Sequence, residues 1–227
     1  MREFVNMPSR VKKLPLSEKG FPIPYFAAFN EVTGKRDFRM ISEVKMASAI
    51  RHDKCWVCGE KLGTYKAFVI GPMCAINRTI SDPPSHKDCA TFSAINCPFL
   101  SSPTAKRNER DPLPSSSQKA AGLGLKRNPT ACAVWVTKSY RTFSPPGGGV
   151  LFEIGDPEEV LWFSKGVSAT IEQVQHSIDT GLPKLRELCD VDGPAAHAEL
   201  DRRIISIQPL LPSESSSLSP SRSEETQ

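Results

Sequence analysis

Residues 55–59 (CWVCG) and 83–89 (PPSHKDC) carry the side chains that decide the fold of the N-terminal half. The first stretch has two residues between its cysteines, so that a tight turn can present both sulfurs to one ion, and Gly59 can adopt the positive φ of such a turn. The second stretch places His86 and Cys89 three residues apart, on one face of a helix that begins near the two prolines. Zinc prefers four tetrahedral ligands drawn from thiolates and imidazoles. We therefore predict one structural Zn²⁺ ion bound by Cys55, Cys58, His86 and Cys89.

The residues between the two ligand pairs predict a treble-clef-like finger. Residues 65–70 and 74–77 are mainly apolar and flank a Gly-Pro pair, which predicts two short strands about a turn. A knuckle, a hairpin and then a helix with the last two ligands is the treble-clef order. His86 is the weakest of the four ligands, and Cys74 or Cys97 is the alternative. Redox chemistry at Cys55 and Cys58 is disfavoured, because Gly59 disfavours the helix that a redox motif normally starts.

The same region resembles a group of uncharacterised bacterial and phage proteins. The resemblance rests on residues 55–100, and above all on residues 67–78 (AFVIGPMCAINR). These proteins share a knuckle, an apolar hairpin and an H-x-x-C helix. The resemblance covers residues 8–100 clearly and residues 155–188 weakly. It implies a zinc site and a phage or bacterial source, and it implies no activity.

Composition divides the chain into three parts and a tail, with an α+β fold. Residues 1–100 contain the predicted finger, preceded by a hairpin and a short helix capped by Ser42. Residues 101–131 are rich in proline, serine and basic residues, which predicts a solvated linker or, less favourably, a basic binding arm. Residues 132–211 predict a β-β-β-α-α-α unit. Residues 212–227 are rich in serine and glutamate, which predicts a disordered tail.

The β-β-β-α-α-α prediction depends on periodicity and on helix signals. Residues 133–137, 150–154 and 160–163 are apolar runs bounded by turn residues, as expected of strands. Thr170 and Gln173 form a capping-box pattern that starts the first helix, and Gly181 is expected to end it. Pro183 then opens a second helix, and residues 195–207 form the third.

Cysteine content and hydropathy predict a cytoplasmic protein. The chain has 227 residues and seven cysteines, begins without the pattern of a secretion signal, and has no apolar run of about 18 residues that could span a membrane. Thiols stay reduced in the cytoplasm, where cysteines act as metal ligands or buried groups before they form disulfides.

The net charge of +4 is distributed unevenly along the chain. Residues 1–100 have a net charge of +6, and residues 132–227 have a net charge of −6. A basic half predicts a binding module whose partner is nucleic acid, contacted through the N-terminal half and the linker, or else a protein. The candidate phosphate contacts are Lys12, Lys13, Lys35, Arg36, Arg39, Lys106, Arg107 and Arg110.

An enzymatic alternative is a derivative of the HNH nucleases, which also resemble this chain in their knuckle, hairpin and helix. Those enzymes need a catalytic histidine on the hairpin. Here no histidine lies between Cys58 and His86, and His86 is assigned to zinc. We therefore predict no catalytic residues and favour a non-enzymatic binding protein.

Overall fold

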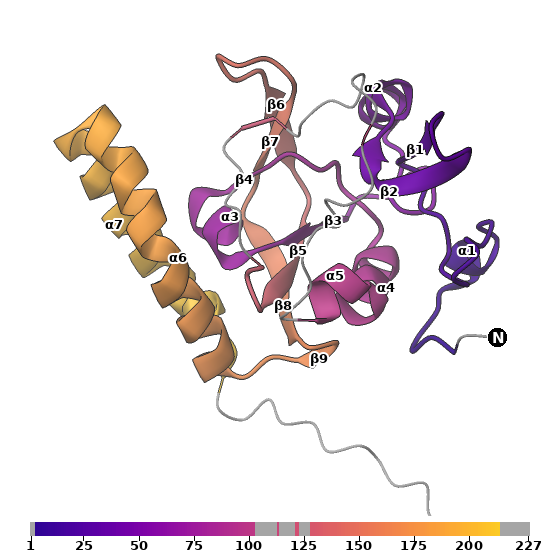
Figure 1. Cartoon of the computed structure of the whole chain (residues 1–227). Coiled ribbons are helices and arrows are strands. Elements are labelled where there is room, and N and C mark those ends of the chain that lie inside the picture. The colour runs from indigo at the N-terminus through magenta and orange to yellow at the C-terminus, as the bar shows by residue number, and fades with distance from the viewer. Residues whose placement is uncertain (1–2, 103–112, 114–120, 123–127, 214–227) are drawn as a thin grey trace, which may run out of the picture.

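The computed structural model describes residues 3–102, 113, 121–122 and 128–213, and its fold is α+β, as the sequence predicts (Figure 1). The central sheet is antiparallel and has the strand order β3-β5-β8-β9. These strands are β3 (Lys66–Ile70), β5 (Cys132–Thr137), β8 (Pro157–Ser164) and β9 (Val167–Ser168). Because β3 pairs with β5, residues 1–100 and 132–211 share one sheet.

Strand β5 is buried on both faces, and its alternating side chains belong to two hydrophobic clusters. Val134 packs in a cluster with Ala90 and Ala94 of helix α4 (Lys87–Asn96). Trp135 points the other way, into a cluster formed by α3 (Pro72–Asn77), α6 (Ile171–Asp192) and α7 (Pro194–Ile207). Successive side chains of a strand point to opposite faces, so β5 is the layer between α4 and the α6–α7 pair (Figure 1).

A second sheet has the order β4-β7-β6 and packs against the same core. Its strands are β4 (Thr79–Ile80), β6 (Tyr140–Phe143) and β7 (Leu151–Ile154). Tyr140 and Phe152 from this sheet contact the ring of Phe68 in β3, at centroid distances of 5.7 and 6.3 Å. The remaining turn after α7 is a 3₁₀ helix, η1 (Gln208–Leu210), and the Leu210 carbonyl accepts a hydrogen bond from Trp162 Nε1 at 2.8 Å.

The N-terminal elements form a separate layer beside α4 (Figure 1). They are α1 (Ser9–Lys12), the hairpin of β1 (Ala27–Asn30) and β2 (Lys35–Ile41), and α2 (Glu43–Arg51). A short helix, α5 (Pro98–Ser101), follows α4. The Ser42 side chain caps α2 by accepting from the Lys45 backbone N–H, as predicted. The Thr170–Gln173 capping box at the start of α6 is also confirmed, as is the last helix, α7.

Two local predictions are wrong. Residues 74–77 were expected as a strand, but residues 72–77 form helix α3, with Pro72 at its first position and Met73, Ala75 and Ile76 buried. Gly181 does not end a helix, since α6 continues through Gly181 and Pro183 to Asp192. Burial explains both differences: these helices pack on each other in one cluster, and that packing outweighs the local preference of glycine and proline.

The unit at residues 132–211 is therefore not β-β-β-α-α-α. It has five strands, because β6 and β9 add to the three predicted ones, and its predicted first two helices are one. Strand β6 is mostly exposed and polar, so it lacks the apolar alternation of a buried strand. The predicted linker and tail fall largely on residues that lie outside the described part of the chain.

The shared sheet leads to a stability prediction. Phe68 is 1% exposed and joins β3 to the C-terminal half, so Phe68→Ala is expected to lower the free energy of unfolding by about 3–5 kcal/mol. Phe143→Ala in β6 is the control, because this ring is largely exposed, and its expected change is below about 1 kcal/mol. Urea unfolding followed by tryptophan fluorescence measures both. Equal losses in the two variants would show that Phe68 does not join the halves.

Candidate metal centre

The first two ligands lie on a tight knuckle between α2 and β3. Lys54 and Lys61 form an antiparallel bridge that closes the knuckle. Inside it, the Gly59 backbone N–H donates to the Cys55 carbonyl at 2.8 Å. Gly59 has φ +78°, and a Cβ atom there would lie 2.6 Å from Cδ2 of Tyr25. The turn therefore needs glycine for its backbone conformation and for the close approach of the Tyr25 ring.

The other two ligands are placed by helix α4. The segment before α4 is fixed by reciprocal backbone hydrogen bonds between Ala67 in β3 and Ser85, at 2.8 and 2.7 Å. His86 is the N-cap residue of α4, and Cys89 lies in its first turn. Since α4 itself packs on β5, the central sheet determines where these two ligands stand.

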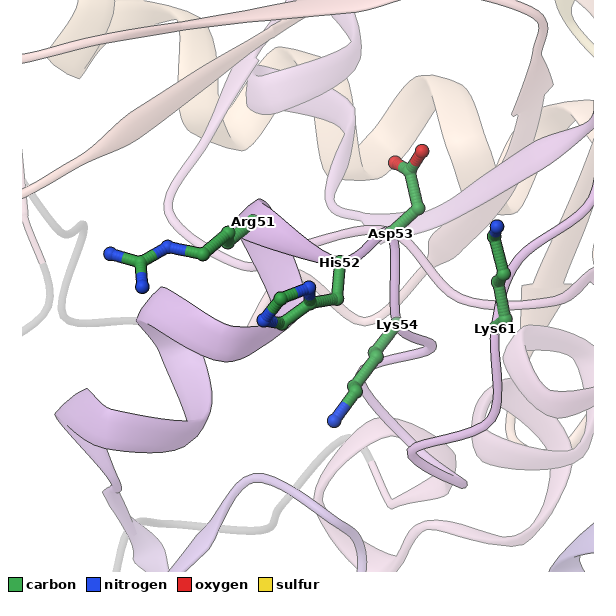
Figure 2. A pocket seen from close by; sticks show the side chains of 5 residues that line it. All are labelled: Arg51, His52, Asp53, Lys54 and Lys61. Carbon is green, nitrogen blue, oxygen red and sulfur yellow. The ribbon is translucent and has the colours of Figure 1, made fainter.

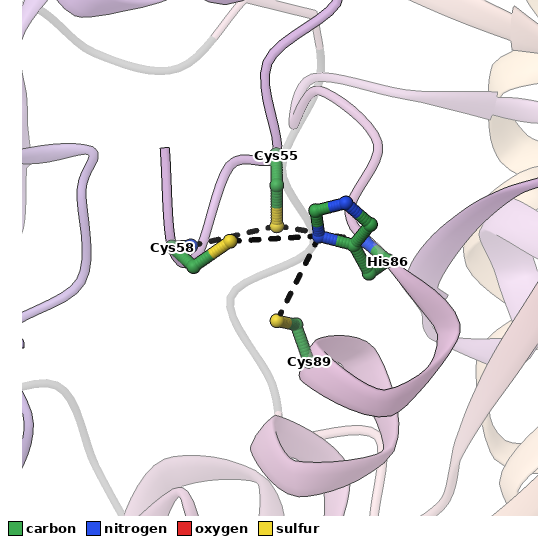
Figure 3. Close-up of side chains that lie close together, drawn as sticks. All are labelled: Cys55, Cys58, His86 and Cys89. Carbon is green, nitrogen blue, oxygen red and sulfur yellow. Dashed lines mark hydrogen bonds between the residues drawn. The ribbon is translucent and has the colours of Figure 1, made fainter. Parts of the chain in front are cut away.

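The four side chains converge on one point, as Figure 3 shows. The three Sγ atoms and one ring nitrogen of His86 all lie within 4.8 Å of one another. His86 Nδ1 is 3.5 Å from Cys58 Sγ and 4.0 Å from Cys89 Sγ. Tetrahedral zinc with ordinary bond lengths would separate sulfur and nitrogen ligands by about 3.6 Å. The group can therefore hold one metal ion, and its donor set suits a metal that prefers sulfur and imidazole.

A hydrogen bond fixes the orientation and the tautomer of the His86 ring. His86 Nε2 lies 3.0 Å from the Lys61 carbonyl oxygen, which can only accept, so Nε2 carries the proton and donates. The lone pair of Nδ1 then faces the three sulfurs. Metal-binding histidines commonly use such an outer hydrogen bond to a carbonyl.

The protein surrounds Cys55 with hydrogen-bond donors. The backbone N–H groups of Cys58 and His86 each donate to Cys55 Sγ at 3.4 Å. Side-chain hydrogen bonds from Cys58 and Cys89, together with these amides, lower the pKa of Cys55. The same interaction with Cys55 raises the pKa of Cys58 to about 11 and raises the pKa of Cys89. Without metal, Cys55 is therefore the thiolate, and it accepts hydrogen bonds from the protonated thiols of Cys58 and Cys89.

All four predicted ligands are thus brought together, and the alternative ligands are elsewhere. Within the described residues, the cluster contains neither Cys74 nor Cys97. Cys74 lies on α3 and packs against the core below α6, and burial raises its pKa to about 11. Cys97 is the C-cap residue of α4, at the opposite end of the helix from Cys89.

An open pocket of about 610 Å³ lies beside the knuckle (Figure 2). It is lined by Arg51, His52, Asp53, Lys54 and Lys61. Lys54 directly precedes Cys55, and the Lys61 carbonyl accepts the hydrogen bond from His86, so the pocket adjoins the metal ligands. No sequence pattern predicts this pocket by itself, and its one sign in the sequence is the run of polar residues 51–54 directly before Cys55.

Among the described residues, some cations are paired with a carboxylate and others are not. Of the predicted phosphate contacts, Lys13, Lys35 and Arg39 pair with Glu60, Glu18 and Asp37 at 3.3, 2.7 and 2.5 Å. Lys106, Arg107 and Arg110 lie outside the described residues. In the described part of the chain, Arg51, Lys54 and Lys61 form no ion pair.

Comparison with known proteins gives no neighbour: no protein-family model, curated protein or solved structure is significantly similar to this chain. The class of site therefore follows from the geometry alone, which is that of a Cys₃His cluster able to hold one metal ion. Among the described residues, no helix combines the length and the apolar character needed to cross a bilayer.

The knuckle turn predicts a large effect of a small substitution. Gly59→Ala forces a side chain into the positive-φ region and against Tyr25, so the metal-loaded protein is expected to lose about 2 kcal/mol in the free energy of unfolding. Gly63→Ala is the matched control, since nothing lies within 4 Å of its Cβ position, and its expected change is below about 1 kcal/mol. Urea unfolding with excess metal compares them. Similar values for the two variants would contradict this account of the knuckle.

The thiol protons predict how metal binding depends on pH. Cys58 and Cys89 have raised pKa values, so both are protonated at neutral pH without metal and must lose their protons to bind it. Two released protons make the metal affinity fall about 100-fold for each unit by which pH is lowered near neutrality. Calorimetry with Co²⁺ in buffers of different ionisation enthalpy counts the protons. Release of none would contradict the thiol assignment.

Proposed function

We propose that this protein is a nucleic-acid-binding module whose knuckle is fixed to α4 by one structural Zn²⁺ ion. The observation that carries the proposal is the pocket beside the four ligands, where Arg51, Lys54 and Lys61 have no ion-pair partner in the described residues. In this proposal the finger is a treble-clef-like binding module, and it contacts the phosphate backbone of the nucleic acid.

The donor set favours zinc in a structural role. Three thiolates and one imidazole match the tetrahedral sites in which zinc is closed to water. With Cys55, Cys58, His86 and Cys89 all bound, a tetrahedral ion would have no position left for a substrate or a hydrolytic water. Zinc would supply here a fixed charge and four bonds between the knuckle and α4.

The small core around the ligands supports the structural role. Cys55 and Cys89 are buried in one cluster with Val11, Val57, Leu62 and Phe92. A cluster of this size contributes little hydrophobic free energy by itself, so a bound metal would supply much of the folding free energy of this region. Removal of the metal is therefore expected to unfold the finger before the central sheet.

The charge of the finger favours an anionic partner. Residues 1–100 have a net charge of +6. Three cations without an ion pair in the described residues, Arg51, Lys54 and Lys61, line the pocket at the knuckle together with one carboxylate, Asp53, and zinc would hold their backbone in place. Lys and Arg side chains without carboxylate partners break no ion pair when a phosphate approaches, and their binding is favoured by the release of counterions condensed on the nucleic acid. Such contacts position the backbone of a nucleic acid without reading its bases.

Native mass spectrometry tests the metal. The wild-type protein is expected to carry one zinc ion, and Cys89→Ala and His86→Ala are each expected to lose it or to bind it at least about 10-fold more weakly. Cys97→Ala is the control, because this thiol lies outside the ligand group. A folded, reduced wild-type protein without zinc would reject the proposed site.

Anisotropy titration of a labelled oligonucleotide across a salt series tests the partner. The double variant Lys54→Gln, Lys61→Gln is expected to bind more weakly and to lower the slope of log K against log salt by about 2. Lys184→Gln removes a cation of α6 that is already paired with Glu187, and it should leave the slope unchanged. No binding by the zinc-loaded protein at low salt would reject nucleic acid and leave a protein as the partner.

A further inference from the structure

The β1–β2 hairpin has two chemically different faces. The register pairs Phe29 with Arg36, so these side chains share a face. Phe38 follows Arg36 by two residues in β2, at the point where the pairing with β1 becomes irregular. The opposite face carries Asn30 and Asp37, which are joined by a hydrogen bond of 3.4 Å. We refer below to Phe29, Arg36 and Phe38, with the neighbouring Lys45, as the hairpin face.

The two rings of the hairpin face are unusually open to solvent. Phe29 is 53% exposed and Phe38 is 41% exposed, although both lie within strands of the hairpin. Neither ring takes part in a ring–ring contact in the described part of the chain, whereas Phe26 next to the hairpin stacks on Trp56 at 5.2 Å. Two open rings on one small hairpin leave apolar surface that folding itself does not use.

The cations of the hairpin face are held close together. Arg36 Nη1 and Lys45 Nζ donate to the same oxygen, the carbonyl of Ala27, at 3.1 and 3.3 Å. Burial and the neighbouring Arg36 both lower the pKa of Lys45. Neither cation forms an ion pair within the described residues, so two like charges share one carbonyl without a carboxylate between them. An approaching anion would relieve this repulsion.

The hairpin face is also linked to the pocket beside the zinc ligands. Lys45 Nζ and Lys54 Nζ lie 5.3 and 5.9 Å from the centroid of the Tyr25 ring. The Tyr25 backbone N–H donates to the Val57 carbonyl of the knuckle at 2.7 Å. Cations therefore follow one another from the hairpin, past Tyr25, to the pocket.

From these observations we infer that the hairpin face binds single-stranded nucleic acid. Unpaired bases stack on Phe29 and Phe38, and the phosphates between them contact Arg36 and Lys45. The inference rests on the proposed function and adds to it the form of the nucleic acid. Base–ring stacking needs an open base face, which a single strand offers and a continuous duplex does not. A protein partner would use the same rings but would not need the two unpaired cations.

Binding of a single strand, compared with a duplex of the same sequence, tests this inference on the zinc-loaded full chain. Phe29→Ala and Phe38→Ala are each expected to weaken single-strand binding at least about 5-fold. Phe143→Ala removes an equally exposed ring of β6 and should change nothing. Phe29→Trp keeps a stacking ring, so it should restore the affinity, and its fluorescence should be quenched by the single strand.

The cations are tested separately. Arg36→Gln with Lys45→Gln is expected to lower the salt slope by about 2 and to leave the preference for single strands, which the rings determine. Zinc stoichiometry and circular dichroism of each variant confirm that the fold is retained. If a variant loses its fold, the quenching of Phe29→Trp decides the question.

The outcomes separate this inference from the proposed function. The role of the hairpin face would be overturned if the protein bound single strand and duplex equally well and if Phe29→Ala and Phe38→Ala had the same affinity as Phe143→Ala. Nucleic-acid binding itself would then remain. No binding of either form would remove both. A preference for single strands that is lost in Phe29→Ala and Phe38→Ala but kept in Phe29→Trp would establish base stacking on this hairpin.

Discussion

Strand β5 pairs with β3 from the N-terminal half on one side and with β8 on the other, and both of its faces are covered by helices. Val134 contributes to the cluster below α4, and Trp135 contributes to the cluster below α6 and α7. Removing either layer would expose one whole face of this strand to water. The burial of β5 therefore requires both halves of the chain at once, although they are far apart in the sequence.

The metal centre depends on that arrangement. Helix α4 is held by its packing on β3 and β5, and it carries Cys89 and begins at His86. The knuckle with Cys55 and Cys58 is fixed separately, through its own bridge and through the Tyr25 ring over Gly59. The four side chains thus lie where a sheet-bound helix meets a turn that packs against it. Val57 and Leu62 are buried with Phe92 of α4, and the Trp56 backbone N–H donates to the Pro84 carbonyl at 3.0 Å. A metal bound there would couple the order of the turn to the order of the sheet.

The same cluster adjoins the charged surface of the pocket. Lys54 and Lys61 flank the knuckle in sequence, and the carbonyl of Lys61 also orients the His86 ring. A change in the ligand group would therefore move the backbone that carries these cations. Tyr25 extends the link to Lys45 and to the exposed hairpin. The Cys₃His cluster, the cations without ion pairs and the exposed aromatic rings lie along one continuous part of the fold.

The sequence by itself determined the features that depend on local spacing. The two Cys/His pairs, the Ser42 and Thr170 caps and the apolar runs of β5 and β7 are each set within a few residues. The structure brings the two pairs together, and the caps and strands agree with their predictions. Only the tertiary structure decided that residues 72–77 are helical and that α6 passes through Pro183, because burial between helices outweighs local preference. It also decided the pairing of β3 with β5, the pocket at the knuckle and the pairing state of each cation. These features depend on contacts between residues that are distant in sequence, and a local sequence pattern does not specify which distant residues come into contact.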